Sequence, residues 1–588
     1  MSRQSLQEHF LGQITAQVEP APMPSPPTPD LPGMAGKALN YLRGNPDPAR
    51  DYECKFELGP LGIPVHYPHS VPPNQYAYDP ISLADTDCRM DWQYPHMREM
   101  VGEREACDVE VGVRTRIMSY MKPDHLAWVN PAAWTGSPIE GLWISKWASA
   151  NIMISLTDTY ARTGEAEARR EAQATFRALK ALAEWRDRKA FYPGGPVPVK
   201  DGEYLTEGWA AAHCKNYPFI VEPCVHYGVT CADQEAVDFA VAMMEGFMAK
   251  LQVPDQGDTA FDPETGAFAG HTHLHTRTLW GAAHLGAVLN EPRYLDWAER
   301  GYEFVRAHGM DVGWYPEHIP QGRHRAETCI TGDMAATALW LAHRHPHYFD
   351  HLERIVRNYL RATQFCLTPE FQALFEKLHA DKPRAVVEQA LAELRKLEGG
   401  FVAAPAPDDW VEADQSLGAT GRTACGLDMM GCCPPEGMRA LWDAWSNTVQ
   451  ERDGAIWINM SLDRVHPVAD VCVGPVEGLA AVSMRIRARR AGRYLLRPPA
   501  WATEVSLSHG GNLMPLRWGG PDEAYVVCDS VKVGDRLNMT YALPELVQSH
   551  ALRSVPGKEK AMTLHWRGND LLAMSPSGTY LPMFGVRR

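Results

Sequence analysis

The feature that most restricts the fold of this 588-residue chain is a series of paired amphipathic stretches separated by short breaks. Between residues 97 and 450, apolar residues recur at helical spacing, as in Ala168, Ala172 and Phe176. Antiparallel helical hairpins that repeat in this way predict a closed α/α toroid or an α-solenoid. The breaks give a repeat of 55 to 67 residues and centre on positions 164, 231, 291 and 346.

The segments between the hairpins favour the toroid over the solenoid. They are long and hold clusters of polar and aromatic residues. Loops of that kind, presented by a rigid scaffold, commonly form an active site. We therefore expect a mainly α-helical barrel with its chemistry at one rim.

The pattern changes near Asp453-Gly454, where helical spacing gives way to alternation. Ile456, Ile458 and Met460 alternate with polar residues, and turns that contain glycine separate the runs that follow. The chain therefore ends in a predicted antiparallel β-sandwich. The expected domains are a Pro-rich N-terminal extension, a helical catalytic domain and the β-sandwich, at residues 1–35, 36–453 and 454–588.

Charge and composition exclude several classes of function. The net charge is −15, from 57 basic and 72 acidic residues, and the chain has no polybasic run, so nucleic acid is not an expected partner. Hydrophobic stretches are too short to span a membrane, and the N-terminus does not have the pattern of a signal peptide. The 13 cysteines lack the spacing of a disulfide framework, so we expect reduced thiols and a cytoplasmic location.

Metal-ligand chemistry gathers at the predicted starts of two helices. Glu327 and Cys329 precede one periodic run, and Cys432 and Cys433 precede another, with two prolines that only a first helical turn tolerates. A helix N-terminus favours thiolate over thiol. Three thiols and one carboxylate are suited to a tetrahedral zinc site, either functional or purely structural.

These motifs resemble the β-L-arabinofuranosidase family of glycoside hydrolases, family 127. The resemblance covers roughly residues 140 to 545. It implies an (α/α)6 barrel followed by a β-sandwich, and a retaining, exo-acting hydrolase that releases a terminal β-L-arabinofuranose-like sugar. The motifs that carry it are Glu327-Thr328-Cys329, Cys432-Cys433-Pro434-Pro435, Gly313-Trp314-Tyr315-Pro316-Glu317 and Arg497-Pro498-Pro499-Ala500-Trp501.

The resemblance also implies roles for individual residues. Zn2+ would be held by Glu327, Cys329, Cys432 and Cys433, and Cys432 would be the nucleophile. The sequence departs from the family at Glu436, where the family usually has Asn, and in the position of the general acid/base, which lies further upstream in the family.

Glu317 is our candidate for that general acid/base. It lies in an aromatic, His-rich loop, and such surroundings are expected to raise the pKa of a carboxyl group. The alternative is a solvated loop acid.

Candidate substrate-binding residues lie in two segments before helical runs. His273 and His275 belong to an alternating histidine cluster, in a region where family members contact sugar hydroxyls, and Trp314 is suited to stacking on a sugar face. For each of the three residues, packing in the core is the alternative.

Two other functions remain open from the sequence. One is a catalytically silent carbohydrate-binding or scaffold protein with a structural zinc. The other is a different α/α-toroid enzyme, such as a sugar epimerase or lyase, which the thiolate cluster disfavours. The expected partner of the leading hypothesis is an oligosaccharide or glycoside.

Overall fold

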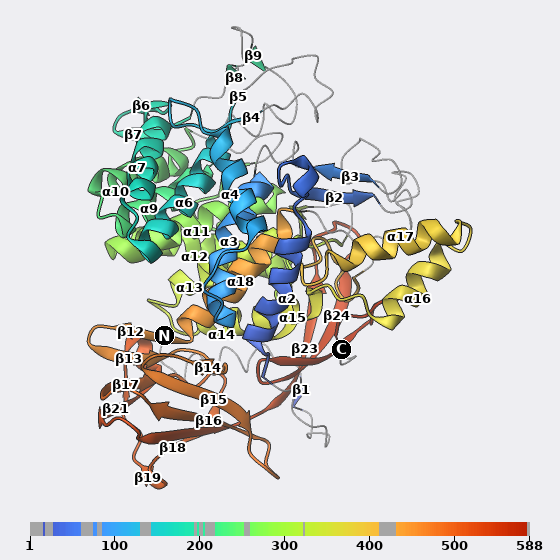
Figure 1. Ribbon diagram of the computed structural model, residues 1–588. Helices are drawn as coiled ribbons and strands as arrows, with labels where there is room; N and C mark the ends of the chain where they lie inside the picture. Colours follow the sequence, from blue (N-terminus) through green and yellow to red (C-terminus); the bar gives the residue numbers. More distant parts are fainter. Residues whose placement is uncertain are drawn as a thin grey trace.

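The computed structural model describes most of the chain and shows a helical region joined to a β-rich C-terminal region (Figure 1). Among the described residues, no helix has the length and apolar character needed to cross a membrane. The described ranges are 16–17, 28–59, 75–78, 85–129, 143–192, 197–198, 204–205, 218–251, 259–320, 324–410 and 431–584.

A closed ring of helices lies at the centre of the helical region. Each helix of the ring contacts the next, and the last one contacts the first. In ring order the members are α3 (Asp85–Val101), α6 (Lys146–Thr163), α9 (Val221–Thr230), α11 (Thr272–Leu289), α13 (Thr328–Leu341) and α18 (Cys433–Asn447).

Further helices pack outside this ring, most of them mainly against one of its members. The partners of α3 are α2 (Leu31–Gly44) and α4 (Asp108–Tyr120), and those of α6, α9, α11 and α13 are α7 (Ala166–Ala181), α10 (Gln234–Met248), α12 (Pro292–His308) and α14 (Tyr348–Arg354). A π-helical turn (Ile355–Leu360), α15 (Arg361–Thr363), α16 (Pro369–Leu378) and α17 (Arg384–Arg395) follow.

Each predicted break lies between a helix of the ring and the outer helix that follows it, as between α6 and α7. Helix α6 ends at Gly164, whose φ of 72° lies in the left-handed region that favours glycine, and α11 ends at Asn290 with a φ of 50°. The mainly helical character and the β-rich C-terminal region are therefore confirmed. The hairpin number of the (α/α)6 barrel and the sandwich remain predictions.

Short antiparallel strand pairs lie in the segments between the helices. They are β2 (Lys55–Gly59) with β3 (Gln75–Tyr78), β4 (Trp128–Val129) with β5 (Trp143–Ile144), β6 (Glu184–Arg186) with β7 (Lys189–Phe191), β8 (Val197–Pro198) with β9 (Tyr204–Leu205), and β10 (Gly270–His271) with β11 (His318–Ile319).

Two sheets of the C-terminal region share one hydrophobic core, which is what a sandwich requires. The first has the order β12 (Val449–Arg452), β13 (Ala455–Ile458), β17 (Gly492–Leu496), β21 (Tyr525–Val531), β20 (Trp518–Gly519). The second has the order β14 (Arg464–Val465), β15 (Ala469–Pro475), β16 (Ala481–Ala488), β22 (Arg536–Ala542), β18 (Thr503–His509), β19 (Asn512–Met514).

One strand pair corrects the expected antiparallel pattern. Strands β13 and β17 are parallel, with Ile456 opposite Tyr494. Between them the chain passes through β14, β15 and β16 of the other sheet, and a crossover of that kind returns a strand in the same direction.

A third sheet contributes residues to the core of the helical region. It has the order β1 (Ala16–Gln17), β23 (Glu545–Leu552), β24 (Lys560–Arg567), β25 (Asp570–Ser575). Its residues Leu546, Leu564 and Trp566 belong to the helical core, as does Leu31 at the start of α2. The last strands therefore pack with the helical domain, and the boundary expected at residue 35 falls inside α2.

The Arg497-Pro498-Pro499-Ala500-Trp501 motif joins the helical and β-rich regions. Arg497 forms a buried ion pair with Asp350 of α14, and the Ala500 N–H donates to the same carboxylate at 2.8 Å. The motif therefore has a structural role at this junction.

Candidate metal centre

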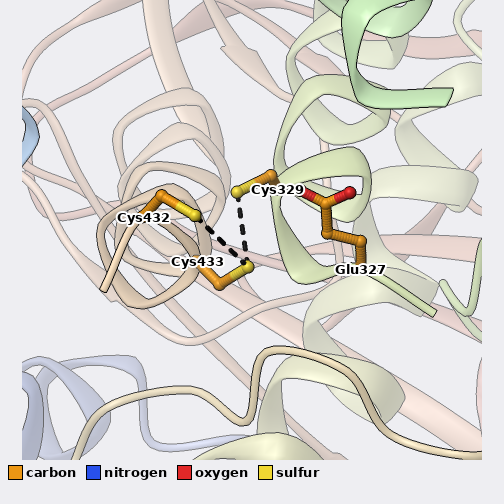
Figure 2. Close-up of side chains that lie close together, drawn as sticks. All are labelled: Glu327, Cys329, Cys432 and Cys433. Carbon is orange, nitrogen blue, oxygen red and sulfur yellow. Dashed lines mark hydrogen bonds between the residues drawn. The ribbon is translucent and has the colours of Figure 1, made fainter. Parts of the chain in front are cut away.

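Two helix N-termini bring the predicted ligands together, as Figure 2 shows. Glu327 directly precedes α13 and Cys329 lies in its first turn, whereas Cys432 precedes α18 and Cys433 is its first residue. One ligand atom from each of the four residues lies within 4.8 Å of the others. The sequence prediction that these residues form one cluster agrees with this geometry.

The spacing of the sulfur atoms fits a tetrahedral ion. The Cys329 and Cys433 sulfurs are 3.4 Å apart, and those of Cys432 and Cys433 are 4.0 Å apart. Zinc–sulfur bonds of about 2.3 Å at tetrahedral angles separate two sulfurs by about 3.8 Å, between the two observed values. The donor set can therefore hold a metal ion without large rearrangement.

Close packing of α13 against α18 sets this convergence. A Cβ at Gly332 of α13 would lie 2.8 Å from the Glu436 carbonyl oxygen of α18. Two hydrogen bonds fix Thr328, the first residue of α13: its N–H donates to the Ala403 carbonyl at 2.8 Å, and its hydroxyl donates to the Val402 carbonyl. Glycine at position 332 thus permits the approach that aligns the two helix ends.

The three thiols are not equivalent. Hydrogen bonds from Cys329 and Cys433 hold the pKa of Cys432 well below its usual range, whereas burial raises the pKa of Cys329 and of Cys433. Cys329 and Cys433 are fully buried, while Cys432 is partly exposed. Cys432 is therefore both the most exposed cysteine of the cluster and the one that most readily carries the negative charge.

His271 orients the carboxylate ligand, a role that the sequence analysis missed. Its Nε2 lies 2.8 Å from Glu327 Oε2. Burial would raise the pKa of Glu327, but the charge and hydrogen bond of His271, assisted by His273, lower it to about 2. Glu327 is thus held as a carboxylate ready to bind a cation.

We predict that His271→Gln lowers metal affinity by about tenfold, because partners that orient a metal ligand typically contribute that much. Competition with a chromogenic chelator would measure the change. His318→Gln is the matched control, since His318 faces His271 across the β10–β11 pair with a ring separation of 4.9 Å. Equal losses in the two variants would contradict an orienting role for His271.

Glu317 lies beside this cluster and is not a solvated loop acid. Its side chain is buried, and its carboxylate lies 3.2 Å from Arg325 Nε. The negative charge of Glu317 raises the pKa of Glu327, which places the two carboxylates within electrostatic range of each other. Its general acid/base role remains a prediction.

His273 lies in the buried layer beneath the cluster. Its Nδ1 is 2.7 Å from Asp333 Oδ2 and its Nε2 is 3.4 Å from an Arg89 nitrogen, with the Phe219 ring 5.6 Å away. An ionised Asp333 carboxylate and the Arg89 guanidinium fix the tautomer: Nδ1–H donates a hydrogen bond to Asp333, and Nε2 accepts one from Arg89. The contacts of His273 are therefore with the protein interior next to the site.

Two predicted substrate-binding residues belong to the core. Both ring nitrogens of His275 lie within 2.9 Å of main-chain carbonyls, and its ring stacks on Phe268. Two residues along a helix face nearly opposite directions, which separates His275 from His273. Trp314 is fully buried and donates to the Pro405 carbonyl at 3.1 Å. Both side chains therefore have the contacts of packed core residues, and their substrate-binding roles stay predictions.

The sequence analysis also missed a network of buried charges beneath the thiols. It is centred on Glu436, which stood out in the sequence only as a departure from the family pattern. Two of its three partners come from distant segments and the third lies one helical turn away, so local patterns gave no signal for the network as a whole. The three partners are Arg89, Arg277 and Arg439.

Comparison with known proteins identifies the fold. No protein-family model matches the chain, and no relative is found among curated proteins. Among solved structures, the chain is similar to a family 127 β-L-arabinofuranosidase from Geobacillus stearothermophilus T6, with a TM-score of 0.54 and 11% identity over 91% of this chain and 80% of that chain.

Two further structures agree. One is described as a family 127 β-arabinofuranosidase, with a TM-score of 0.55 and 10% identity over 97% of this chain and 83% of that chain. The other is described as a glycoside hydrolase, with a TM-score of 0.54 and 11% identity over 83% and 77%. At these identities the similarity establishes a shared fold.

Proposed function

We propose, from a fold shared with family 127 structures, that this protein is a retaining, exo-acting glycoside hydrolase. The proposed substrate carries a terminal β-L-arabinofuranose-like sugar, and Cys432 is the nucleophile. The observation that carries the proposal is the Glu/Cys3 cluster at the N-terminal ends of α13 and α18. We also propose a cytoplasmic location, because thiols stay reduced in a reducing compartment.

The proposed cofactor is Zn2+, held by Glu327, Cys329, Cys432 and Cys433. When bound there, zinc would keep the thiols deprotonated at neutral pH. Thiolate ligands and a carboxylate suit zinc better than a hard cation such as Mg2+, which prefers oxygen alone.

Cys432 is suited to attack because it is the only one of the three cysteines that is not fully buried. In the first step the Cys432 sulfur bonds to the anomeric carbon while the glycosidic C–O bond breaks, and Glu317 donates a proton to the leaving oxygen. In the second step Glu317 takes a proton from water, the water oxygen bonds to the anomeric carbon, and the C–S bond breaks. Two displacements retain the anomeric configuration.

Glu317 can be tested by varying the leaving group. We expect Glu317→Ala to slow alkyl furanosides strongly, by about 10²-fold or more, and activated aryl furanosides much less, because a good leaving group needs little protonation. Initial rates on the two substrate classes measure the difference. Equal losses on both would remove Glu317 from the acid role.

The alternative is a silent carbohydrate-binding or scaffold protein with a structural zinc. It is favoured by the count of four protein ligands, since structural sites usually have no open position. A panel of aryl furanosides and pyranosides, with metal analysis of the same sample, separates the two. We expect one metal ion per chain and hydrolysis of a furanoside, whereas full metal occupancy without turnover would support the alternative.

A further inference from the structure

The buried charge network lies directly beneath the candidate metal centre and links four helices of the ring. Glu436 of α18 is almost fully buried, and its carboxylate forms ion pairs with the guanidinium groups of three arginines. Asp333 of α13 lies 3.3 Å from one of these arginines and 3.6 Å from another. The three arginines are Arg89 of α3, Arg277 of α11 and Arg439 of α18.

Arg89 connects this network to the thiols. One of its terminal nitrogens lies 2.9 Å from Glu436 Oε1 and 3.7 Å from the Cys329 sulfur. The other lies 3.4 Å from His273 Nε2, and the guanidinium carbon is 5.1 Å from the Trp147 ring centre. Both terminal nitrogens thus bind protein atoms, so Arg89 is fixed against the sulfur and is not arranged to bind a substrate anion.

The signs of the charges support a link between network and metal centre. Three thiolates and one carboxylate carry four negative charges, two more than a divalent ion neutralises. Within the described residues, three guanidinium groups in the network face the carboxylates of Glu436 and Asp333. Asp443 lies 3.5 Å from Arg439, but burial raises its pKa to about 7, so at neutral pH it offsets only part of the remaining positive charge.

We propose that Arg89 is a positioning residue of the metal centre: held by Glu436, it donates to the Cys329 sulfur, offsets the excess negative charge of the ligand set and keeps Cys329 as a permanent ligand. The inference rests on the proposed metal-dependent function and deepens it.

This arrangement gives Cys329 and Cys432 different roles. A hydrogen bond withdraws electron density from a thiolate, so the Cys329 sulfur is the weaker nucleophile. Cys432 lies on the accessible side of the cluster. The network thus gives a physical reason why one cysteine of a ligand set reacts while another remains bound.

Arg89→Lys tests the inference, with Arg277→Lys as the matched control. Both arginines are almost fully buried and both bind Glu436 Oε1, whereas only Arg89 is placed against a sulfur. Chelator competition measures metal affinity, and the thiolate-to-metal charge-transfer band of the Co2+-substituted protein reports directly on the sulfur ligands.

We expect Arg89→Lys to weaken Co2+ and Zn2+ binding by at least about tenfold and to shift the charge-transfer band. Arg277→Lys should change affinity less than about threefold, although it lowers thermal stability. If Arg89→Lys does not fold, Glu436→Asp can replace it, because the shorter side chain moves the carboxylate that holds Arg89 by one methylene. We expect the same loss of metal affinity and the same shift of the charge-transfer band.

Unchanged affinity and spectrum in the folded Arg89 variant, or equal losses in both arginine variants, would overturn the inference while the proposed function stands. A wild-type protein that binds neither Zn2+ nor Co2+ would instead overturn the proposed function, and the inference with it.

Discussion

Cys432→Ser is expected to reduce turnover of a furanoside substrate by at least about three orders of magnitude while most of the bound metal is retained. An alcohol is a far poorer nucleophile than a thiolate at neutral pH. Glu327, Cys329 and Cys433 remain as ligands, and Cys329 and Cys433 are fully buried in the wild-type protein. Turnover and metal content must be measured on the same preparation.

Cys366→Ser is a suitable control for this variant. Cys366 is also partly exposed, and it follows Phe365, outside the metal cluster. Its replacement should leave both turnover and metal content near wild type. Near-normal turnover in metal-bound Cys432→Ser would contradict the nucleophile assignment, because no other sulfur of the cluster is as accessible.

The second large effect is expected for Cys433→Ser, which should lose the metal and the stability that depends on it. The Cys433 sulfur lies close to both other sulfurs, at 3.4 Å and 4.0 Å. At a free metal concentration of 100 times Kd, binding stabilises a folded protein by about 2.7 kcal/mol. Thermal unfolding with and without chelator should show this difference in the wild type and little of it in Cys433→Ser.

Cys224→Ser separates loss of metal from loss of packing. Cys224 is as fully buried as Cys433 but lies in α9, and burial, together with the nearby charge of Glu222, raises the pKa of its thiol. This variant should lower thermal stability yet keep the full response to chelator. A Cys433 variant that responds to chelator as strongly as Cys224→Ser would show that Cys433 is not a ligand.

The sequence predicted those parts of the molecule that local patterns encode. The hairpin breaks at Gly164 and Asn290 follow from backbone preferences, and the prolines after Cys433 mark the first turn of α18. Glu327 and Cys329 could be placed for the same reason, at the start of a periodic run.

Features that depend on distant contacts were not predictable. Helix α3 begins at Asp85, before the periodic stretches that start near residue 97, so periodicity gave no signal that Arg89 lies in a helix. Its contacts with Cys329 and Glu436 join positions 240 and 347 residues apart. Likewise, periodicity alone cannot show that His275 packs on Phe268 in the core while His273 contacts Arg89 next to the site.

The central claim is that Cys432 forms the covalent bond to the sugar, and peptide mapping after labelling tests it most directly. The metal-loaded protein would be incubated with a furanosyl analogue that carries an electrophile at its anomeric position, then digested and analysed by mass spectrometry. The account predicts one adduct per chain, on Cys432 and not on Cys433 or Cys329. An adduct on a carboxylate such as Glu317 would contradict it.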